Sequence, residues 1–456
     1  MKEADKDKTD RGKAAALGTE NVWHLLVQYA IPSVIAMTAA SLYNITDSIF
    51  IGHGVGALAI SGMAITFPLM NLAAAFGSLV GVGAAALMSL RLGQKDYASA
   101  NAILGNVIVL NLILGSVYTL FVLLFLDPIL RFFGASSETI GYARDYMQVI
   151  AGGTVITHMY LGLNALLRAT GQPQQAMRAI LSSVFINAVL AWLFIFQFGW
   201  GIRGAGIATV SAQALMLTRQ IRLFNNRQNL IHIRKGTFVL RRQIVKDSLA
   251  IGLAPFLMNA AGSVIVIVIN RGLISHGGDL HVGAYGIVNR VAFLFAMVVL
   301  GITQGMQPIA GYNFGAGQFD RVNRVLRQAI LLATAVMTTG FLIGELFPHA
   351  VAAAFTTDTT LIDLVVPGMR IIFLFFPIVG FQMVTANFFQ SIGMAGKAIL
   401  MSLTRQVLYL LPCLIILPHF FGVKGVWYSL PTADLLSSLL AGWLLVRQYK
   451  SFKTAQ

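Results

Sequence analysis

One acidic residue interrupts an apolar run near the start of the chain. Asp47 lies in the stretch Tyr43-Asn44-Ile45-Thr46-Asp47-Ser48. An ionised Asp at the centre of a bilayer costs at least ~2.5 kcal/mol on insertion scales. A carboxylate kept there faces a wet cavity, holds a cation or is protonated by desolvation. An Asp that only hydrogen-bonds a neighbouring helix is the alternative, and Tyr43 lies one turn earlier on the same face.

Further polar residues lie inside apolar stretches of both halves of the chain. Asn187 and Thr209 suit interhelical hydrogen bonds. Arg290 lies nine residues past His281, so it pairs with a backbone carbonyl or faces a cavity. The candidates for lining a substrate cavity are Tyr43, Asn44, Arg290, Gln304 and Gln307.

The chain has no recognisable catalytic or cofactor motif. It has no phosphate-binding P-loop, no Cys–His cluster and no nucleophile elbow, and Cys413 is its single cysteine. We therefore expect no enzyme activity, no bound metal and no cofactor beyond a coupling ion, H⁺ or Na⁺. Transport energy would then come from an ion gradient.

The elements that must position these residues are membrane helices. Hydrophobic residues make up 57% of the 456 residues and charged residues 11%, against roughly 25% charged in soluble domains. Because a spanning helix needs about 20 apolar residues, we predict twelve spans. Their approximate ranges are 22–50, 57–90, 101–126, 140–167, 175–198, 202–222, 244–273, 281–310, 324–347, 361–391, 397–421 and 424–447.

Basic residues predict the orientation of these spans. The net charge is +15, and Lys and Arg gather in alternate loops, above all between spans 6 and 7. The positive-inside rule then places both termini and this linker in the cytoplasm of a multi-pass protein of the inner (plasma) membrane. We attribute the positive charge to the membrane orientation of the helices and to contact with anionic lipids. We do not expect the protein to bind nucleic acid. A regulatory polybasic site in the linker is the alternative.

The chain repeats its own pattern of glycines and prolines. Gly171 and Gly393 lie 222 residues apart, and Gly201 and Gly422 lie 221 apart. Six helices per half is an even number, so the repeat is parallel, with a pseudo-two-fold axis along the membrane normal. The predicted fold is an all-α integral membrane protein of two six-helix lobes. The expected domains are a disordered cytoplasmic tail (1–20), an N-lobe (21–222), a solvated cytoplasmic linker (223–243), a C-lobe (244–448) and a cytoplasmic tail (449–456).

The two halves share a proline early in their first spans, Pro32 and Pro255, but differ at the position of Asp47. Pro32 lies early in the first span and is expected to bend it. The counterpart of Asp47 at an offset of 223 is Asn270, so the carboxylate that could couple ions is expected in the N-lobe alone.

Several stretches resemble the multidrug and toxic compound extrusion (MATE) family, with the closest likeness to its MepA-like bacterial branch. They are Asp47-Ser48-Ile49-Phe50-Ile51-Gly52, Leu166-Leu167-Arg168-Ala169-Thr170-Gly171-Gln172-Pro173 and the helix-8 stretch from Gly301 to Ala316. The resemblance implies a central V-shaped cavity and efflux of amphipathic, often cationic drugs against a proton or sodium gradient. It also implies ion-coupling roles for Asp47, Asn187 and Thr209, and a bend at Pro32 that accompanies ion binding.

The sequence departs from the family pattern at Ala191. Family members commonly carry Asp there, four residues after Asn187. Loss of that carboxylate favours H⁺ over Na⁺ as the coupling ion. We thus predict a monomeric multidrug/H⁺ antiporter whose partners are small-molecule drugs or toxic metabolites and membrane lipids. A flippase for lipids or lipid-linked saccharides, of a related fold, is the alternative.

Overall fold

The computed structural model describes residues 15–234 and 236–454. Within these ranges the side chains of Leu42, Asn44, Ile45, Ala57, Asp279, Lys453 and Thr454 are not described. The first half contains α2 (Val22–Gly54), α3 (Ala57–Gly93), α4 (Tyr97–Leu124), α5 (Leu126–Phe132), α6 (Ile140–Gly152), α7 (Thr154–Ala169), α8 (Pro173–Trp192), the π-helical turn η1 (Leu193–Gln197) and α9 (Gly201–Asn225).

The second half repeats this order of elements. It contains α10 (Arg242–Gly277), α11 (Asp279–Gly315), α12 (Phe319–Leu346), α13 (Pro348–Ala353), α14 (Thr359–Phe373), α15 (Phe376–Ser391), α16 (Ala395–Leu403), the π-helical turn η2 (Thr404–Leu410), α17 (Leu411–Phe421) and α18 (Val423–Thr454).

The helices match the predicted membrane spans. Nine of the described helical segments are long and apolar enough to cross a membrane, and the bent pairs α6–α7 and α14–α15 add two more. Helix α9, which is rich in Gly, Ala, Ser and Thr, is the twelfth. The fold is therefore the expected all-α membrane protein with twelve helices in two lobes, the N-lobe of α2–α9 and the C-lobe of α10–α18.

The backbone confirms the internal repeat. Left-handed φ angles recur 222 residues apart in three pairs and 221 apart in a fourth, namely Gly56 and Gly278, Lys95 and Gly317, Gly171 and Gly393, and Gly201 and Gly422. The bends between α6 and α7 and between α14 and α15 are both 52°. Equivalent turns and equivalent bends give the two lobes the same helix arrangement.

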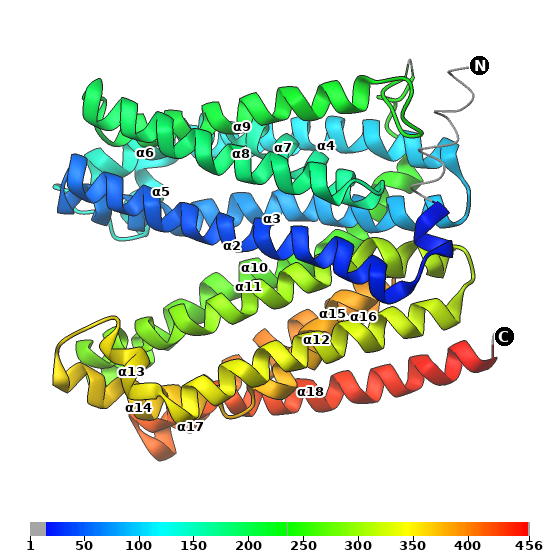
Figure 1. Cartoon of the computed structure of the whole chain (residues 1–456). Helices are drawn as coiled ribbons and strands as arrows, with labels where there is room; N and C mark the ends of the chain where they lie inside the picture. The colour runs from blue at the N-terminus through cyan, green and yellow to red at the C-terminus, as the bar shows by residue number, and fades with distance from the viewer. Residues whose placement is uncertain (1–14, 235, 455–456) are drawn as a thin grey trace.

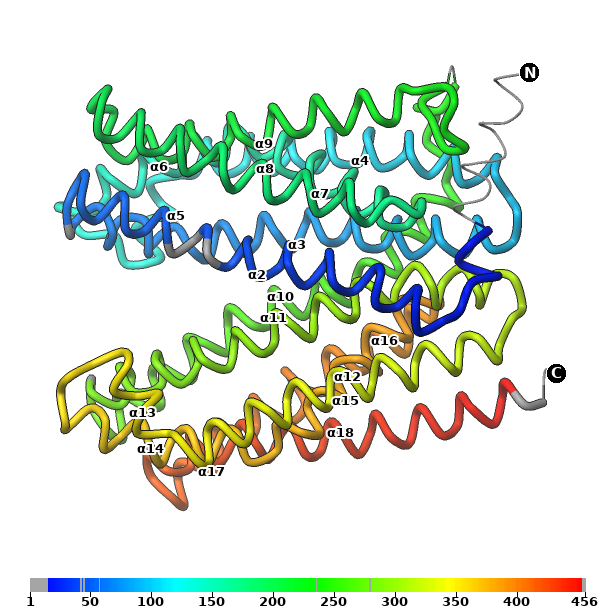
Figure 2. Tube along the Cα trace, viewed as in Figure 1, coloured from blue at the N-terminus to red at the C-terminus, as the bar shows by residue number. Residues whose placement is uncertain are grey.

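The two lobes meet at one end of the molecule and diverge toward the other (Figure 1). Both described chain ends and the α9–α10 connection lie at the end where the lobes meet, as the tube in Figure 2 also shows. The short helix α5 and its counterpart α13 lie at the diverging end. We call these the closed end and the open end.

Small residues bring the lobes together at the closed end. A Cβ on Gly83 would lie 2.0 Å from the Ser248 carbonyl oxygen, and one on Gly305 would lie 2.6 Å from Ala30 backbone atoms. A Cβ on Gly315 would lie 2.2 Å from the Leu90 carbonyl oxygen. Glycine is required at these points because backbones touch there, as is common between membrane helices.

The segment before α2 differs from the expected tail. Most of that prediction falls on residues 1–14, outside the described residues. Residues 15–19 form a short helix, and Leu17 is buried. Asn313 and Arg321 of the C-lobe both donate hydrogen bonds to the Leu17 carbonyl oxygen, at 2.9 and 3.0 Å. The start of the N-lobe is therefore tied to the C-lobe at the closed end.

The linker between the lobes is hydrogen-bonded to the N-lobe. Asn101 on α4 accepts a hydrogen bond from the His232 backbone N–H at 3.0 Å. Asn106 donates to the Val239 carbonyl at 3.1 Å and accepts from the Arg241 N–H at 3.0 Å. Two α4 amides thus satisfy backbone groups of this segment, and most of its described residues are exposed. The linker belongs to the N-lobe.

Candidate functional site

A buried polar cluster lies inside the N-lobe, on three helices. Asp47 of α2 is 4% exposed. The side-chain amide of Asn187, on α8, donates a hydrogen bond of 3.3 Å to Asp47 Oδ1. Tyr43, one turn earlier on α2, also hydrogen-bonds Asp47. The cluster satisfies the carboxyl group without a basic partner.

The cluster extends to the third helix through Tyr43. Its hydroxyl lies 2.6 Å from Thr209 Oγ1 on α9. The Thr209 hydroxyl in turn donates to the Ala205 carbonyl at 3.1 Å. The structure therefore brings together Asp47, Asn187 and Thr209, which the sequence had placed in three separate spans, and adds Tyr43 as the link between them.

Apolar packing surrounds this cluster on its open-end side. Ile51, Ala191 and Tyr146 are all buried in one apolar cluster, and Ala191 is fully buried. The position where the MATE family commonly has a second carboxylate is thus a tightly packed methyl group. Asn187 Oδ1 is buried without a hydrogen-bond partner among the described residues. That oxygen, the Asp47 carboxylate and the Thr209 hydroxyl are the groups that could contact a coupling ion.

The other predicted site residues lie elsewhere. Pro32 is buried in α2, between Ala30 and Val34, which contact Gly305 and Gly301 of the C-lobe. Arg290 is exposed on α11. Asn44 lies within α2, but its side chain is outside the described residues.

Gln304 and Gln307 join the lobes. Gln304 donates to the Met37 sulfur at 3.3 Å, and Gln307 donates to the Val82 carbonyl at 3.3 Å. The sequence made them candidates either for lining a cavity or for hydrogen bonds between helices. In the structure both make hydrogen bonds between helices, because they lie on the face of α11 that meets α2 and α3. Figure 1 shows α11 beside α2 at this contact.

The structure adds an ion pair that the sequence analysis missed. Arg405 Nε on η2 donates to Asp434 Oδ1 on α18 at 2.8 Å. The sequence analysis placed the carboxylate that could couple ions in the N-lobe alone, and Asp434 is a further carboxylate in the membrane helices, already paired with a basic side chain. A signal was present, since each residue is a charge inside a predicted span and such charges tend to pair.

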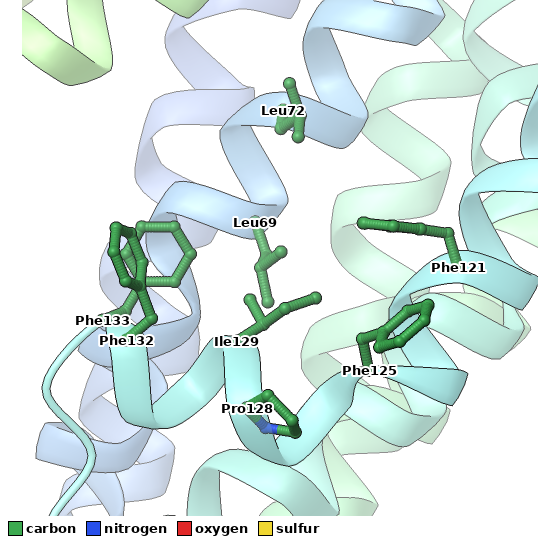
Figure 3. A pocket seen from close by; sticks show the side chains of 8 residues that line it. All are labelled: Leu69, Leu72, Phe121, Phe125, Pro128, Ile129, Phe132 and Phe133. Carbon is green, nitrogen blue, oxygen red and sulfur yellow. The ribbon is translucent and has the colours of Figure 1, made fainter.

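A separate apolar recess lies at the open end of the N-lobe. It encloses about 470 Å³ and is lined by Leu69, Leu72, Phe121, Phe125, Pro128, Ile129, Phe132 and Phe133. Figure 3 shows these side chains arranged around α5 and the facing turns of α3 and α4. Its lining has no charged or hydrogen-bonding side chain, so it is distinct from the Asp47 cluster.

Comparison with known proteins gives one consistent family. The MatE family model matches residues 32–193 and again 251–415, one match in each lobe. The multidrug export protein MepA of Staphylococcus haemolyticus (strain JCSC1435) is 25% identical over 428 residues, which cover 93% of each chain. MepA of Staphylococcus aureus (strain NCTC 8325 / PS 47) is 25% identical over 424 residues and 92% of each chain.

Solved structures share the fold over nearly the whole chain. A crystal structure of MATE in the straight conformation superimposes with a TM-score of 0.91 at 25% identity, covering 97% of this chain and 99% of that one. An outward-facing multidrug resistance MATE family transporter of the MOP superfamily gives a TM-score of 0.90 at 24% identity, with coverage of 97% and 99%. Two matches of the family model, full-length relatives and a common fold lead to one conclusion: the chain belongs to the MatE family of membrane transporters.

Proposed function

We propose that this transporter is a multidrug efflux antiporter that exports amphipathic, often cationic compounds in exchange for H⁺. Full-length relatives that are named multidrug export proteins support the efflux of drugs. The Asp47 cluster supports ion coupling, because it places one carboxyl group in a buried site inside a membrane helix. Asp47 is the group that would take up and release the proton.

The hydrogen-bond network around Asp47 is the observation that carries the proposal. Each hydroxyl has one hydrogen to donate. Thr209 donates its hydrogen to Ala205, so the bond between Tyr43 and Thr209 takes the hydrogen of Tyr43. A tyrosine hydroxyl beside a carboxyl group donates to it when it is charged and can accept from it when it is protonated. The donors in this network would therefore differ between the two charge states of Asp47.

Loss of the proton from Asp47 would rearrange the network. Tyr43 would turn its hydrogen toward the Asp47 carboxylate, and Thr209 would turn from Ala205 to donate to Tyr43. Two helices, α2 and α9, thereby exchange hydrogen-bond partners when one proton leaves. This gives protonation a direct way to favour one shape of the N-lobe over another, which coupling requires.

The composition of the cluster favours H⁺ over Na⁺. Hard cations are commonly held by several oxygen ligands. The cluster has a single carboxylate, and fully buried Ala191 stands where a second one is common in the family. A lone carboxyl group with hydroxyl and amide neighbours is better suited to binding a proton.

The orientation follows from the charge pattern. The closed end bears both ends of the described chain and the basic α9–α10 connection, so the positive-inside rule places it in the cytoplasm. The protein would lie in the plasma membrane, open to the outside, as a monomer in contact with lipids. Its partners would be drugs or toxic metabolites.

Reconstituted vesicles test this proposal. Drug transport would be measured under an imposed pH gradient and, separately, under an imposed Na⁺ gradient, for the unaltered protein and for Asp47→Asn. We expect transport driven by the pH gradient alone, and its loss in Asp47→Asn. Transport that follows the Na⁺ gradient and ignores pH contradicts proton coupling. Full transport by Asp47→Asn removes Asp47 from the mechanism.

A further inference from the structure

The C-lobe contains an ion pair within its membrane-crossing helices, with a buried carboxylate and a partly buried guanidinium. Arg405 places Nε and one terminal nitrogen each 2.8 Å from Asp434 Oδ1. The Asp434 side chain is 7% exposed and that of Arg405 is 28% exposed. Replacing a buried ion pair by apolar residues is often neutral or stabilising. Fold stability alone is therefore a weak reason for keeping these two charges.

The pair lies on the repeat counterparts of the two helices that bear Asn187 and Thr209. At the offset of 222 that relates Gly171 to Gly393, Arg405 corresponds to Ser183, four residues before Asn187. At the offset of 221 that relates Gly201 to Gly422, Asp434 corresponds to Gln213, four residues after Thr209. Four residues are about one helical turn, and in both helices the shift is toward the closed end. The pair thus lies one turn from the level of the N-lobe cluster.

The surroundings of the pair are polar. Arg405 lies in the π-helical turn η2, and such turns are frequent at functional sites. Its neighbours Thr404 and Gln406 each have a buried side-chain oxygen without a hydrogen-bond partner among the described residues. Tyr285 on α11 is a titratable group in electrostatic range of Arg405. Carboxylate oxygens such as those of buried Asp434 are ligands that small hard cations take.

We propose that Asp434 is the carboxylate of a C-lobe cation site, and that this site is occupied by the guanidinium of Arg405. Arginine stays charged in proteins, so this tethered cation neither leaves nor deprotonates during a transport cycle. The C-lobe therefore binds no H⁺ or Na⁺ of its own, and the coupling ion is limited to the N-lobe. The statement about the N-lobe rests on the proposed function. The statement about Asp434 does not.

Removing the tethered cation should expose the site. Arg405→Gln keeps a hydrogen-bonding side chain but leaves Asp434 without its positive partner, so Asp434 should acquire a free cation. The experiment uses the full chain with Asp47→Asn throughout, so that the N-lobe does not respond. The melting temperature Tm would be measured in NaCl and in N-methylglucamine chloride, and at pH 8 and pH 6.

The expected result is specific to Arg405→Gln. Its Tm should rise by at least about 2 °C on adding Na⁺ or on lowering the pH. That rise should vanish when Asp434→Asn is added. Arg405→Lys keeps a tethered positive charge and should respond no more than the parent. A response of Arg405→Gln that equals the parent's, or that survives Asp434→Asn, overturns the proposal.

A second measurement applies if Arg405→Gln does not fold. The doubly neutral variant Arg405→Gln/Asp434→Asn, with Asp47 intact, removes both charges together and should keep the unaltered ratio of ions exchanged per drug molecule. A lower ratio means that the C-lobe pair takes part in coupling and overturns the proposal. Transport that persists in Asp47→Asn would refute the N-lobe role of Asp47 and leave the Tm result for Asp434 unaffected.

Discussion

Asn187 holds Asp47 by a single side-chain hydrogen bond of 3.3 Å, across 140 residues of sequence. This bond and the two bonds made by Tyr43 tie α2, α8 and α9 to one carboxyl group. A change in the charge of that group therefore acts on three helices of the N-lobe at once.

Tyr43→Phe tests the hydrogen-bond relay. The change removes one hydroxyl and leaves the ring, so Asp47 and Thr209 lose their link. We expect drug efflux driven by a pH gradient to fall ~5-fold or more, within the usual range of coupling free energies, with little change in expression. Thr209→Val should produce a loss of similar size, and the double variant should be no worse than either single one. Additive losses would mean that the two residues act separately.

Ala191→Asp tests the choice of coupling ion. The change restores a second carboxylate four residues after Asn187, and we expect transport to become responsive to an Na⁺ gradient. Ala191→Asn, which adds bulk and polarity without charge, is the matched control and should not respond. Vesicles with imposed Na⁺ gradients give the measurement. A variant that folds and remains indifferent to Na⁺ would show that other groups decide the ion.

Gly305→Val tests the closed end. A Cβ there would lie 2.6 Å from Ala30 backbone atoms, so the added side chain forces the lobes apart. Overpacking of this kind typically costs about 1–3 kcal/mol, and we expect a lower Tm and weaker efflux. Gly286→Ala on the same helix is the control, since a Cβ there meets no atom within 4 Å. Equal behaviour of the two variants would argue against a tight contact at Gly305.

Asp96 gives a prediction about pH outside the membrane spans. Its carboxylate caps α4 by accepting from the Ser99 N–H at 3.0 Å, and hydrogen bonds from Ser99 hold its pKa below the usual value. Because the pKa is lowered in the folded state, this stabilisation is present above the unfolded pKa of about 3.9 and is lost as the pH falls through the folded value.

Asp96→Ala should therefore lower stability by about 1 kcal/mol at pH 7. The difference from the unaltered protein should shrink as the pH falls below about 4. Asp96→Asn keeps a side-chain oxygen that can cap the helix and should lose less. The measurement is the Tm of each variant and of the unaltered protein from pH 7 to below pH 4. A Tm difference that does not change with pH would mean that the charge of Asp96 has no part in the cap.

The sequence predicted the fold well because its signals are local. Apolar length marks each span, and Gly171 and Gly393 mark equivalent turns since both adopt φ angles that favour glycine. Asp47 was identifiable because a lone carboxylate in an apolar run is costly wherever the chain folds. Its hydroxyl partner Tyr43 was suggested by helix spacing alone.

The features that the sequence did not predict depend on contacts between distant segments of the chain. Arg405 and Asp434 lie 29 residues apart on different helices, so their pairing emerges only when η2 packs beside α18. Gln304 has the same polarity whether it faces a cavity or Met37, and the helix rotation that decides between them is set by lobe packing. Tertiary packing determines these contacts, and the amino-acid sequence alone gives little indication of them.

The attachment of the linker to α4 determines where the chain can turn between the lobes. Asn106 fixes the backbone up to Arg241, and α10 begins at Arg242. The Arg241 carbonyl accepts from the Val245 N–H of α10 at 3.0 Å, so the chain passes from N-lobe contacts to C-lobe contacts at this one residue. Relative motion of the lobes should concentrate its backbone torsion there. A chain cut at this junction, with both pieces produced together, should still assemble, whereas a cut between Asn226 and Leu240 would release a segment that helps to hold α4.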